Sequence, residues 1–235
     1  GVMWRSEDIF FGLAQGIDAV TGERVASEYS RAEQAAASGG QMVFLVIPPL
    51  MHGAAQIATL SQWFLGNATV LQRKFDPEEA WQLVHDHGIS AGMITGDAVA
   101  RPMIEALEAN PGRWKVDSFF VLSSSAALFS QTVKDRFLEA FPNLMIIDSI
   151  GSTEGGFNGL KYAEKGAKFT GGGPTVTPGA DVVILDEELQ LIPQGDDRIG
   201  KLGRTGNIPL GYFNDPEKTA ENFVVAADGR RYAVG

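Results

Sequence analysis

The sequence predicts an α/β fold, in which a mainly parallel sheet with flanking helices is followed by a smaller β-rich subdomain. From about residue 42, short apolar runs alternate with amphipathic segments, which is typical of strand–helix–strand units. After Gly151, glycine and proline recur at short intervals and leave room only for short strands. Hydrophobic residues make up 44% of the 235 residues, which is enough for a sizeable core.

The strands of the sheet are predicted from apolar runs of four to seven residues. The first run stops at Pro48, because proline cannot donate a hydrogen bond to a neighbouring strand. In chain order, the expected strands are residues 43–47, 68–71, 89–95, 119–122 and 144–147.

The helices are predicted from amphipathic spacing and from the residues that are typical of helix ends. Asp76 and Pro77 indicate the start of one helix, and Gly88 indicates its end. Ser130 is expected to cap another helix with its side chain. The expected ranges are residues 8–13, 31–37, 54–65, 77–87, 97–109 and 131–141.

The chain is expected to have three parts. Residues 1–41 are an N-terminal segment that joins the α/β part, residues 42–156 form the α/β subdomain, and residues 157–235 form the β-rich subdomain. In the last part, residues 171–174 break any helix, and residues 181–185 are predicted to form a short strand.

Composition excludes several classes of function. Nineteen basic residues against 29 acidic residues give a net charge of −10, which argues against nucleic acid as a partner. The absence of cysteine excludes disulfides, thiolate metal sites and a cysteine nucleophile. No apolar run approaches the roughly 18 residues of a transmembrane segment, and no export signal is present, so a cytoplasmic location is expected.

Candidate functional residues lie in the loops that follow the predicted strands. In parallel sheets, ligands bind at the carboxyl ends of the strands, so these loops are expected to converge on one crevice. His52 lies in such a loop, and a role in the site is expected for it. The loops are residues 47–53, 95–97, 123–127 and 148–156.

The loop at residues 148–156 carries the most informative pattern. It combines glycines, hydroxyl side chains and a carboxylate, so its backbone N–H groups can face an anion such as a phosphate. In this interpretation Thr153 donates to a phosphate oxygen, Glu154 holds Mg²⁺, and Gly151 allows a close approach to the backbone. The alternative interpretation is a serine-rich β-turn with an exposed glutamate.

Several motifs resemble, in order, those of the adenylate-forming superfamily, which includes acyl-CoA synthetases, adenylation domains and luciferases. Residues 148–155 resemble the family motif that ends in threonine and glutamate, and residues 200–219 resemble the motif that follows it. Residues 51–53 and 123–128 resemble two further family loops. Residues 1–5, 95–102 and 206–212 also resemble the branch of bacterial fatty-acyl and steroid-side-chain CoA ligases. The resemblance implies part of the large N-terminal domain of such an enzyme.

The resemblance also implies roles for individual residues. Thr153 and Glu154 are the implied catalytic residues, and Glu154 is the implied Mg²⁺ ligand. Two residues depart from the family pattern: Ile150 stands where an aromatic side chain usually stacks on adenine, and Met51 replaces the aromatic residue before the histidine. The implied nucleotide-binding residues are Ser125, Ala126, Ala127, Asp148, Ser149, Gly151, Ser152 and Thr153. The implied acyl-binding residues are His52, Gly53, Ser124, Gly151 and Gly156.

The activity implied for the parent enzyme is the joining of a fatty or steroid-side-chain acid to CoA, through ATP and an acyl-AMP intermediate. Expected ligands are the acid, ATP or AMP, Mg²⁺ and CoA, and a second copy of the chain is a candidate partner. Two alternatives stay open: an adenylating enzyme with another acceptor, and a non-catalytic fragment that binds nucleotide or mediates dimerisation.

Other family motifs have no counterpart in the 235 residues. These are the phosphate-binding loop, the ribose-binding aspartate, and the C-terminal domain with its catalytic lysine. We therefore expect the chain to be an internal fragment of the N-terminal domain, and we expect this fragment alone to be unable to adenylate.

Overall fold

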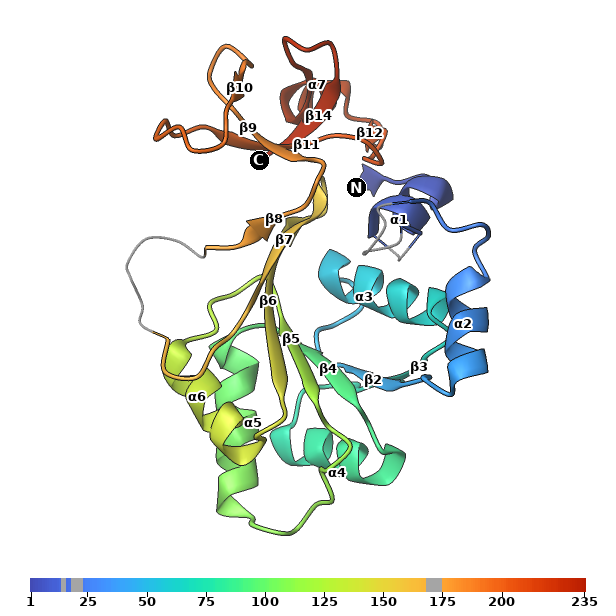
Figure 1. The fold of residues 1–235 in the computed structure, drawn as a ribbon, viewed down its shortest axis with the longest axis vertical. Helices are drawn as coiled ribbons and strands as arrows, with labels where there is room; N and C mark the ends of the chain where they lie inside the picture. Colours follow the sequence, from blue (N-terminus) through green and yellow to red (C-terminus); the bar gives the residue numbers. More distant parts are fainter. Residues whose placement is uncertain (14–15, 18–22, 168–174) are drawn as a thin grey trace. The chain divides into compact units, whose positions relative to one another are not determined.

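A computed structural model of the chain describes residues 1–13, 16–17, 23–167 and 175–235 (Figure 1). Residues 171–174, for which a helix break was predicted, lie outside this description. The chain divides into two compact units. The α/β unit comprises Tyr29–Ile150 and Leu160–Thr177, and the β unit comprises Gly1–Glu28, Gly151–Gly159 and Pro178–Gly235.

The α/β unit is built on a sheet in which the strand order is β3-β2-β4-β5-β6-β7-β8. The pairs β2·β3, β2·β4, β4·β5 and β5·β6 are parallel, which confirms the predicted fold class. β6 and β7 are joined by a short turn and form a hairpin. The strands are β2 (Val43–Val46), β3 (Ala68–Leu71), β4 (Ala91–Ile94), β5 (Val121–Ser124), β6 (Met145–Ser152), β7 (Gly156–Tyr162) and β8 (Thr177–Pro178).

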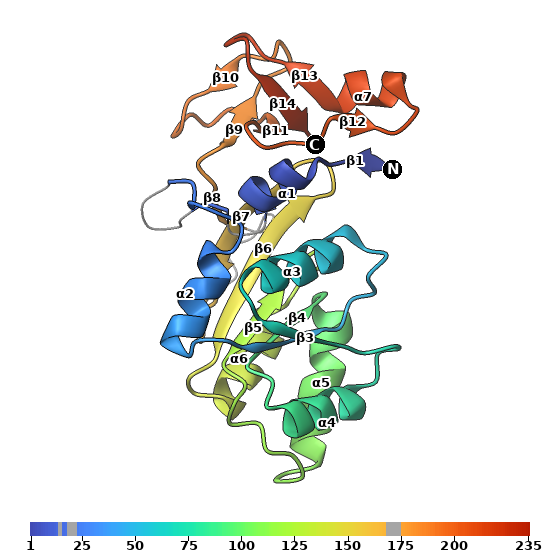
Figure 2. The ribbon, with the colours of Figure 1, turned by 90° about the vertical axis from the view of Figure 1, so that its right-hand side faces the viewer.

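Helices cover both faces of this sheet, as Figure 1 and Figure 2 show. One face is covered by α3, against which α2 packs, and the other face is covered by α4, α5 and α6. The helices are α2 (Ser30–Ser38), α3 (Gly53–Phe64), α4 (Pro77–His87), α5 (Asp97–Ala109) and α6 (Gln131–Ala140). None of the helices in the described ranges has the length and apolar character that crossing a bilayer requires.

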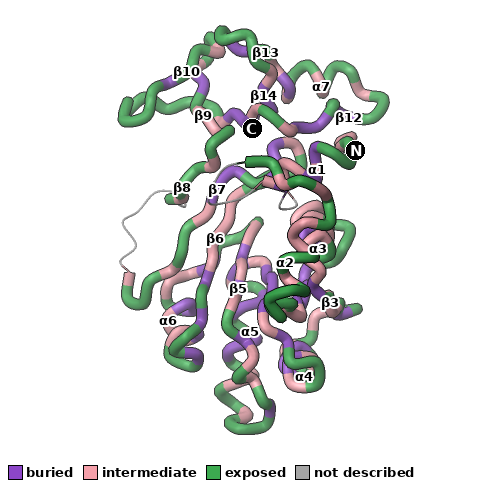
Figure 3. Tube along the Cα trace, turned by 45° about the vertical axis from the view of Figure 1, so that its right-hand side comes forward, coloured by how far each residue is buried: buried purple, intermediate pink, exposed green. Residues whose placement is uncertain are grey.

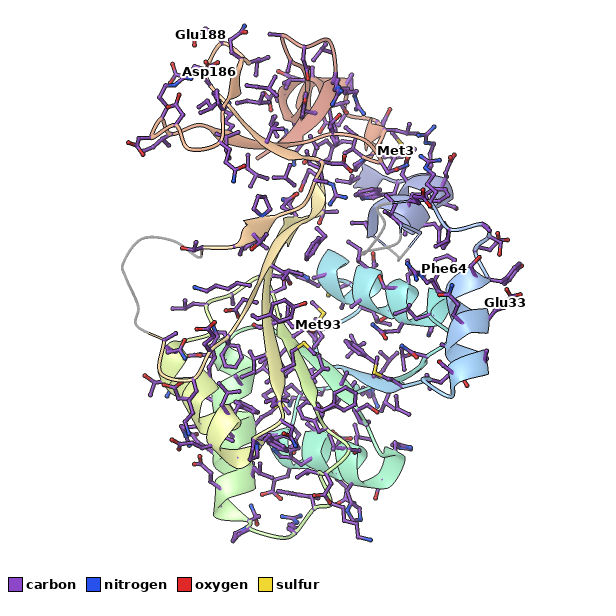
Figure 4. All side chains as sticks on the ribbon, viewed as in Figure 1. Met3, Glu33, Phe64, Met93, Asp186 and Glu188 are labelled. Atoms are coloured by element: carbon purple, nitrogen blue, oxygen red, sulfur yellow. The ribbon has the colours of Figure 1, made fainter. Side chains whose placement is uncertain are left out.

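Alternation along β2 supplies both faces with core residues. Leu45 belongs to the cluster under α4, α5 and α6, whereas its neighbours Phe44 and Val46 pack on the α3 side. Met93 of β4, which is labelled in Figure 4, also packs on the α3 side. Both faces of the strands are therefore buried, as parallel sheets require, and the buried segments can be followed in Figure 3.

The larger core is organised around Trp81 of α4. Its ring stacks on Phe141 at 5.7 Å between centroids and meets Phe119 edge-on at 5.7 Å. Its indole N–H donates to the carbonyl of Met103 in α5 at 2.7 Å, so its one polar atom is satisfied in the core. Trp81 has no exposed surface.

Local signals determine where α4 begins and ends. The carboxylate of Asp76 accepts a hydrogen bond from the backbone N–H of Glu79 at 2.9 Å, and Pro77 occupies the first turn. Gly88 ends the helix in the left-handed region, at φ 58°. These three predictions are confirmed.

Three other local predictions need correction. Ser130 precedes α6 but makes no side-chain cap, because its hydroxyl donates to Asp97 instead. The fourth strand lies at Val121–Ser124 rather than residues 119–122, because its pairing partner β4 begins opposite Val121. β6 continues to Ser152, so residues 148–152, which were expected to form a loop, lie in a strand.

The β unit contains a five-stranded sheet in the order β10-β9-β11-β14-β13, and the pairs β10·β9, β9·β11, β11·β14 and β14·β13 are antiparallel. A separate antiparallel pair joins β1 to β12. The strands are β1 (Val2–Met3), β9 (Val182–Leu185), β10 (Leu191–Ile192), β11 (Lys201–Arg204), β12 (Gly211–Tyr212), β13 (Phe223–Val225) and β14 (Arg231–Val234). The unit also contains the helices α1 (Ser6–Leu13) and α7 (Pro216–Asn222).

The N-terminal 28 residues cluster with the β unit, whereas the sequence suggested that they join the α/β part. The buried Arg204 donates to the carbonyl of Gly12 at 2.9 Å, and it also donates to the carbonyl of Phe157. The amide of Asn207 donates to Asp8 at 3.1 Å. These contacts link residues between 47 and 199 positions apart, so they have no signature in local sequence.

We predict that Trp81→Ala lowers the free energy of unfolding by about 3–5 kcal/mol, because it opens a cavity between α4 and α5. Urea denaturation measures the change. Trp63→Ala is the matched control, since Trp63 is 57% exposed and its loss leaves no cavity. The control is expected to cost less than about 1 kcal/mol. Equal losses in the two variants would contradict the assignment of Trp81 as the centre of the core.

Candidate functional site

The register of the parallel strands brings three chain segments to one edge of the sheet in the α/β unit. Ile94, the last residue of β4, lies opposite Ser124, the last residue of β5, and Ser124 lies opposite Asp148 of β6. The loops after β4 and β5 therefore start at the same level, whereas β6 continues beyond Asp148 to Ser152. The convergence of all four predicted loops on one crevice stays a prediction.

Serine hydroxyl groups at this edge bind backbone atoms. The Ser124 hydroxyl is buried and accepts a hydrogen bond from the Gly96 N–H at 3.0 Å. Ser149 donates to the carbonyl of Ser124 at 3.2 Å, and Ser125 donates to the carbonyl of Ser149 at 3.1 Å. Ser125 and Ser149 add these hydrogen bonds to the backbone pairing of β5 and β6, and Ser124 joins β5 to Gly96. The role that the structure shows for the three side chains is to fix the loop that follows β5.

That loop presents Ala126 and Ala127 to solvent in an unusual backbone conformation. Ala126 has φ 67°, a value that costs free energy for a residue with a Cβ. Both alanines are exposed, so their backbone groups are accessible to a ligand. The surrounding contacts must hold the loop in this conformation.

Gly96 and Asp97 provide those contacts. The Asp97 N–H donates to the carbonyl of Leu128 at 2.9 Å, and the carboxylate accepts from the Ser130 N–H at 2.8 Å and the Ser130 hydroxyl at 2.6 Å. A Cβ at Gly96, where φ is +57°, would lie 2.4 Å from the carbonyl oxygen of Leu128. The Gly-Asp pair thus holds both ends of the loop, a role that the sequence did not reveal.

The environment of Asp97 favours its ionised form. Burial acts to raise its pKa, but hydrogen bonds from Ser130 and the guanidinium of Arg101 together hold the pKa below its usual value. The Arg101 guanidinium donates to the carboxylate at 2.9 Å.

Asp148 forms an ion pair that the sequence did not predict. Its carboxylate accepts a hydrogen bond from the ammonium group of Lys134 in α6. The Lys134 side chain is 9% exposed, whereas that of Asp148 is 25% exposed. Lysine is rarely so buried without a partner, so the carboxylate explains its position.

His52 and Gly53 lie at the start of α3. The Nδ1 atom of His52 accepts a hydrogen bond from the Ala54 N–H at 3.2 Å, so the imidazole caps the helix. Both His52 and the preceding Met51 are exposed. The acyl-binding role expected for His52 and Gly53 stays a prediction, and the cap is the role that the geometry shows.

The second group of predicted residues belongs to the β unit and is described separately. Residues 153–155 form the turn between β6 and β7, and the Ser152 hydroxyl accepts a hydrogen bond from the Gly155 N–H at 2.8 Å. A Cβ at Gly151 would lie 2.3 Å from the carbonyl oxygen of Gly156. Gly156 has φ +69° and is buried against Leu13. Glycine is thus required at both positions, and the close packing of Gly156 shows a structural role for it.

Thr153 and Glu154 occupy the tip of this turn. Thr153 is exposed, and its carbonyl accepts a hydrogen bond from the indole N–H of Trp4 at 2.9 Å. Glu154 is half-buried and accepts a hydrogen bond from the phenol of Tyr212. The turn therefore presents the hydroxyl group of Thr153 next to the carboxylate of Glu154, which the phenol of Tyr212 holds in place.

Tyr212 is itself held firmly. Its backbone N–H donates to the Thr219 hydroxyl at 2.8 Å, and the Lys218 ammonium lies 4.4 Å from its ring centroid. Burial and then the hydrogen bond to Glu154 raise the pKa of Tyr212 to about 12, so the phenol stays a donor at neutral pH. The sequence placed Tyr212 in a motif, but its contact with a residue 58 positions away could not be predicted.

Glu154 fits a magnesium ion that is shared with a phosphate ligand. Mg²⁺ is typically held by one or two carboxylates together with substrate phosphates and water. Within the described ranges no group of three or more His, Cys, Asp or Glu side chains that could hold a metal ion occurs. One carboxylate beside an exposed hydroxyl is instead the donor set expected when phosphate supplies the remaining oxygens.

Known proteins match this chain along its whole length. Residues 2–210 match the family of proteins described as AMP-binding enzymes. A medium/long-chain-fatty-acid–CoA/3-oxocholest-4-en-26-oate–CoA ligase of Mycolicibacterium smegmatis is 45% identical over 237 residues. A 3-oxocholest-4-en-26-oate–CoA ligase of Rhodococcus rhodochrous is 44% identical over 238 residues. Each match covers 100% of this chain, and the chain spans 42% of the length of each of these relatives.

Solved structures share the fold at lower identity. The N-terminal subdomain of NpsA from Klebsiella oxytoca, solved with 3-hydroxybenzoyl-AMSN, matches with a TM-score of 0.72 and 18% identity. That match covers 100% of this chain and 56% of the other. A long-chain-fatty-acid-CoA ligase from Archaeoglobus fulgidus matches with a TM-score of 0.67 and 15% identity, and covers 87% of this chain and 42% of the other.

We predict that Asp97→Asn lowers the free energy of unfolding at pH 7 by about 1–2 kcal/mol, because charge-assisted hydrogen bonds are lost. The folded-state pKa of Asp97 is lowered, so its ionisation stabilises the fold above the pKa of an unfolded aspartate, about 3.9. This contribution is lost as the pH falls through the lowered pKa. Denaturation at pH 7 and at pH values below about 4 should show the difference between the two proteins shrinking with acid. Asp117→Asn, at an exposed position, is the control. A difference that does not change with pH would contradict the assignment.

Proposed function

Because this chain belongs to the family of AMP-binding enzymes, we propose that the protein containing it activates a carboxylic acid with ATP and transfers the acyl group to CoA. In the first step the acid attacks the α-phosphate of ATP and gives acyl-AMP and pyrophosphate. In the second step the CoA thiol displaces AMP. The relatives at 43–45% identity are named as CoA ligases for medium- and long-chain fatty acids or a steroid acid, which supports this acceptor and these acids.

The turn between β6 and β7 is the observation that supports the first step. Adenylation brings two anionic groups together, so it needs hydrogen-bond donors and positive charge at the reacting phosphate. We assign the exposed Thr153 hydroxyl as a donor to an α-phosphate oxygen, with the backbone N–H groups of Ser152 and Thr153 beside it. Gly151 leaves space for the acyl carboxylate to approach the backbone.

Glu154 is assigned as the magnesium ligand, and its hydrogen bond from Tyr212 fixes the orientation of its carboxylate. When bound, Mg²⁺ neutralises charge on the phosphates. Glu154 keeps its own negative charge in this arrangement, because the phenol donor is neutral.

The edge of the sheet in the α/β unit is assigned to the adenine and acyl groups. We propose that the backbone of residues 125–127 borders adenine and that Asp148 accepts a hydrogen bond from the adenine amino group, with Ser149 beside it. Ser124 is buried, so its contribution to the acyl site is through the shape of the backbone. His52 and Gly53, at the exposed start of α3, are proposed to lie at the acyl entrance.

We predict that Glu154→Gln in the full-length protein lowers fatty-acid-dependent ATP–pyrophosphate exchange by at least about 100-fold, because the metal loses its charged protein ligand. The glutamine side chain can still accept from Tyr212, so the fold is retained. Glu221→Gln, which changes an exposed glutamate of α7, is the control and should leave the rate unchanged. An undiminished rate in Glu154→Gln would contradict this assignment.

We also predict that Tyr212→Phe raises the Mg²⁺ concentration needed for half-maximal exchange by about 10-fold, because partners that orient a metal ligand contribute that much to metal affinity. Calorimetric titration of the protein with Mg²⁺ and a non-hydrolysable ATP analogue gives a second readout, independent of turnover. Tyr232→Phe is a matched control, since it removes a buried phenol that donates to Asp228 at 2.8 Å in the same unit. Equal Mg²⁺ requirements in the two variants would show that Tyr212 acts only in folding.

A further inference from the structure

Lys134 is a buried cation in the α/β unit for which the proposed reaction gives no role. It lies on the core-facing side of α6, in the same stripe as Phe137 one turn later, and only 9% of its side chain is exposed. Its ammonium group lies 5.2 Å from the centroid of the Phe129 ring and donates to the carboxylate of Asp148. Removing an ammonium group from water is costly, so this position needs a compensating anion.

Asp148 faces α6 because of its place in β6. Side chains alternate along a strand, so Asp148 shares a face with Ile146, which is 1% exposed and belongs to the core under α6. The carboxylate therefore continues this buried face two residues further along the strand, where the core gives way to solvent. Its 25% exposure shows that part of the group remains accessible.

We propose that Lys134 determines which nucleobase this edge accepts, by holding Asp148 so that one oxygen binds the ammonium group and the other accepts a hydrogen bond from an exocyclic amino group. This inference rests on the proposed binding of a nucleotide at this edge. An ionised carboxylate only accepts hydrogen bonds, so it attracts the 6-amino group of adenine and repels the 6-keto oxygen of hypoxanthine or guanine.

The charge of Lys134 matters as well as its hydrogen bond. Without a cation, a half-buried carboxylate would keep water around it to offset its charge. With Lys134 in place the pair is neutral overall, so a neutral base can bind without leaving an uncompensated charge. Lys134 is therefore a positioning residue that acts through Asp148.

The test uses four forms of the full-length protein: unmodified, Lys134→Met, Asp148→Asn/Lys134→Met and Lys165→Met. ATP and ITP are the probes, since their bases differ at position 6. Calorimetry gives the affinity for each, and pyrophosphate exchange gives the KM for ATP and for the fatty acid. Lys165→Met is the matched control, because Lys165 also pairs with a carboxylate of α6, Glu139 at 3.6 Å, but is 59% exposed.

We expect Lys134→Met to weaken ATP binding by about 10-fold, the effect of losing one charge-assisted hydrogen bond, and to leave the KM for the fatty acid unchanged. The double variant should recover ATP affinity to within about 3-fold of the unmodified protein, because an amide needs no counter-charge. Its preference for ATP over ITP should fall by at least about 10-fold, because a rotated amide can donate to the keto oxygen.

Two results would contradict the inference about Lys134 and leave the proposed function standing. One is unmodified ATP affinity in Lys134→Met, equal to that of Lys165→Met. The other is a loss in Lys134→Met that Asp148→Asn does not reverse, because Lys134 would then act only in folding. If the unmodified protein bound no ATP, the proposed function would be wrong together with this inference. Binding of ATP without fatty-acid-dependent exchange would contradict the proposed reaction but leave the assignment of Lys134 standing.

Discussion

The parallel pairing of β2, β4, β5 and β6 is the constraint on which the α/β unit depends. A parallel sheet must be covered on both faces, so α3 packs on one face while α4, α5 and α6 pack on the other. The same pairing sends these four strands in one direction and aligns Ile94, Ser124 and Asp148 across three strands. The parallel pairing that requires helices on both faces is thus also the reason why these three positions lie at the same level of the sheet.

The loops at that edge are fixed by three serines for which the sequence implied a binding role, together with Asp97. Ser124, Ser125 and Ser149 bind backbone atoms of neighbouring segments, and Asp97 binds the segment that follows β5. The strained backbone of Ala126 depends on these contacts. The hydroxyl groups at this edge therefore serve mainly to fix backbone N–H and C=O groups, and the backbone is the surface to which we assign nucleotide binding.

Sequence predicted the features that depend on local signals and missed those that depend on long-range contacts. Asp76, Pro77 and Gly88 bound α4 as expected, because capping involves residues within one turn. Ser130 carries the same local signal, yet its hydroxyl binds Asp97, 33 positions earlier. The strand at 119–122 was misplaced by two residues because register follows the pairing partner and not the apolar run. The contacts of Asp148 and Glu154 likewise join segments that no short pattern connects.

The carboxylates of Asp148 and Glu154 are held in the same way by two different donors. Asp148 and Glu154 each accept a hydrogen bond from a buried side chain, which fixes the carboxylate and leaves part of it accessible. The donor to Asp148 is a lysine, so the pair has no net charge and suits a neutral group such as the amino group of a base. The donor to Glu154 is a tyrosine whose pKa is raised to about 12, so the phenol stays neutral and the carboxylate keeps its full charge. A full negative charge is what a metal ion bridging to phosphate requires. The charge of the buried donor, and not the carboxylate itself, thus separates the role proposed for Asp148 from the role proposed for Glu154.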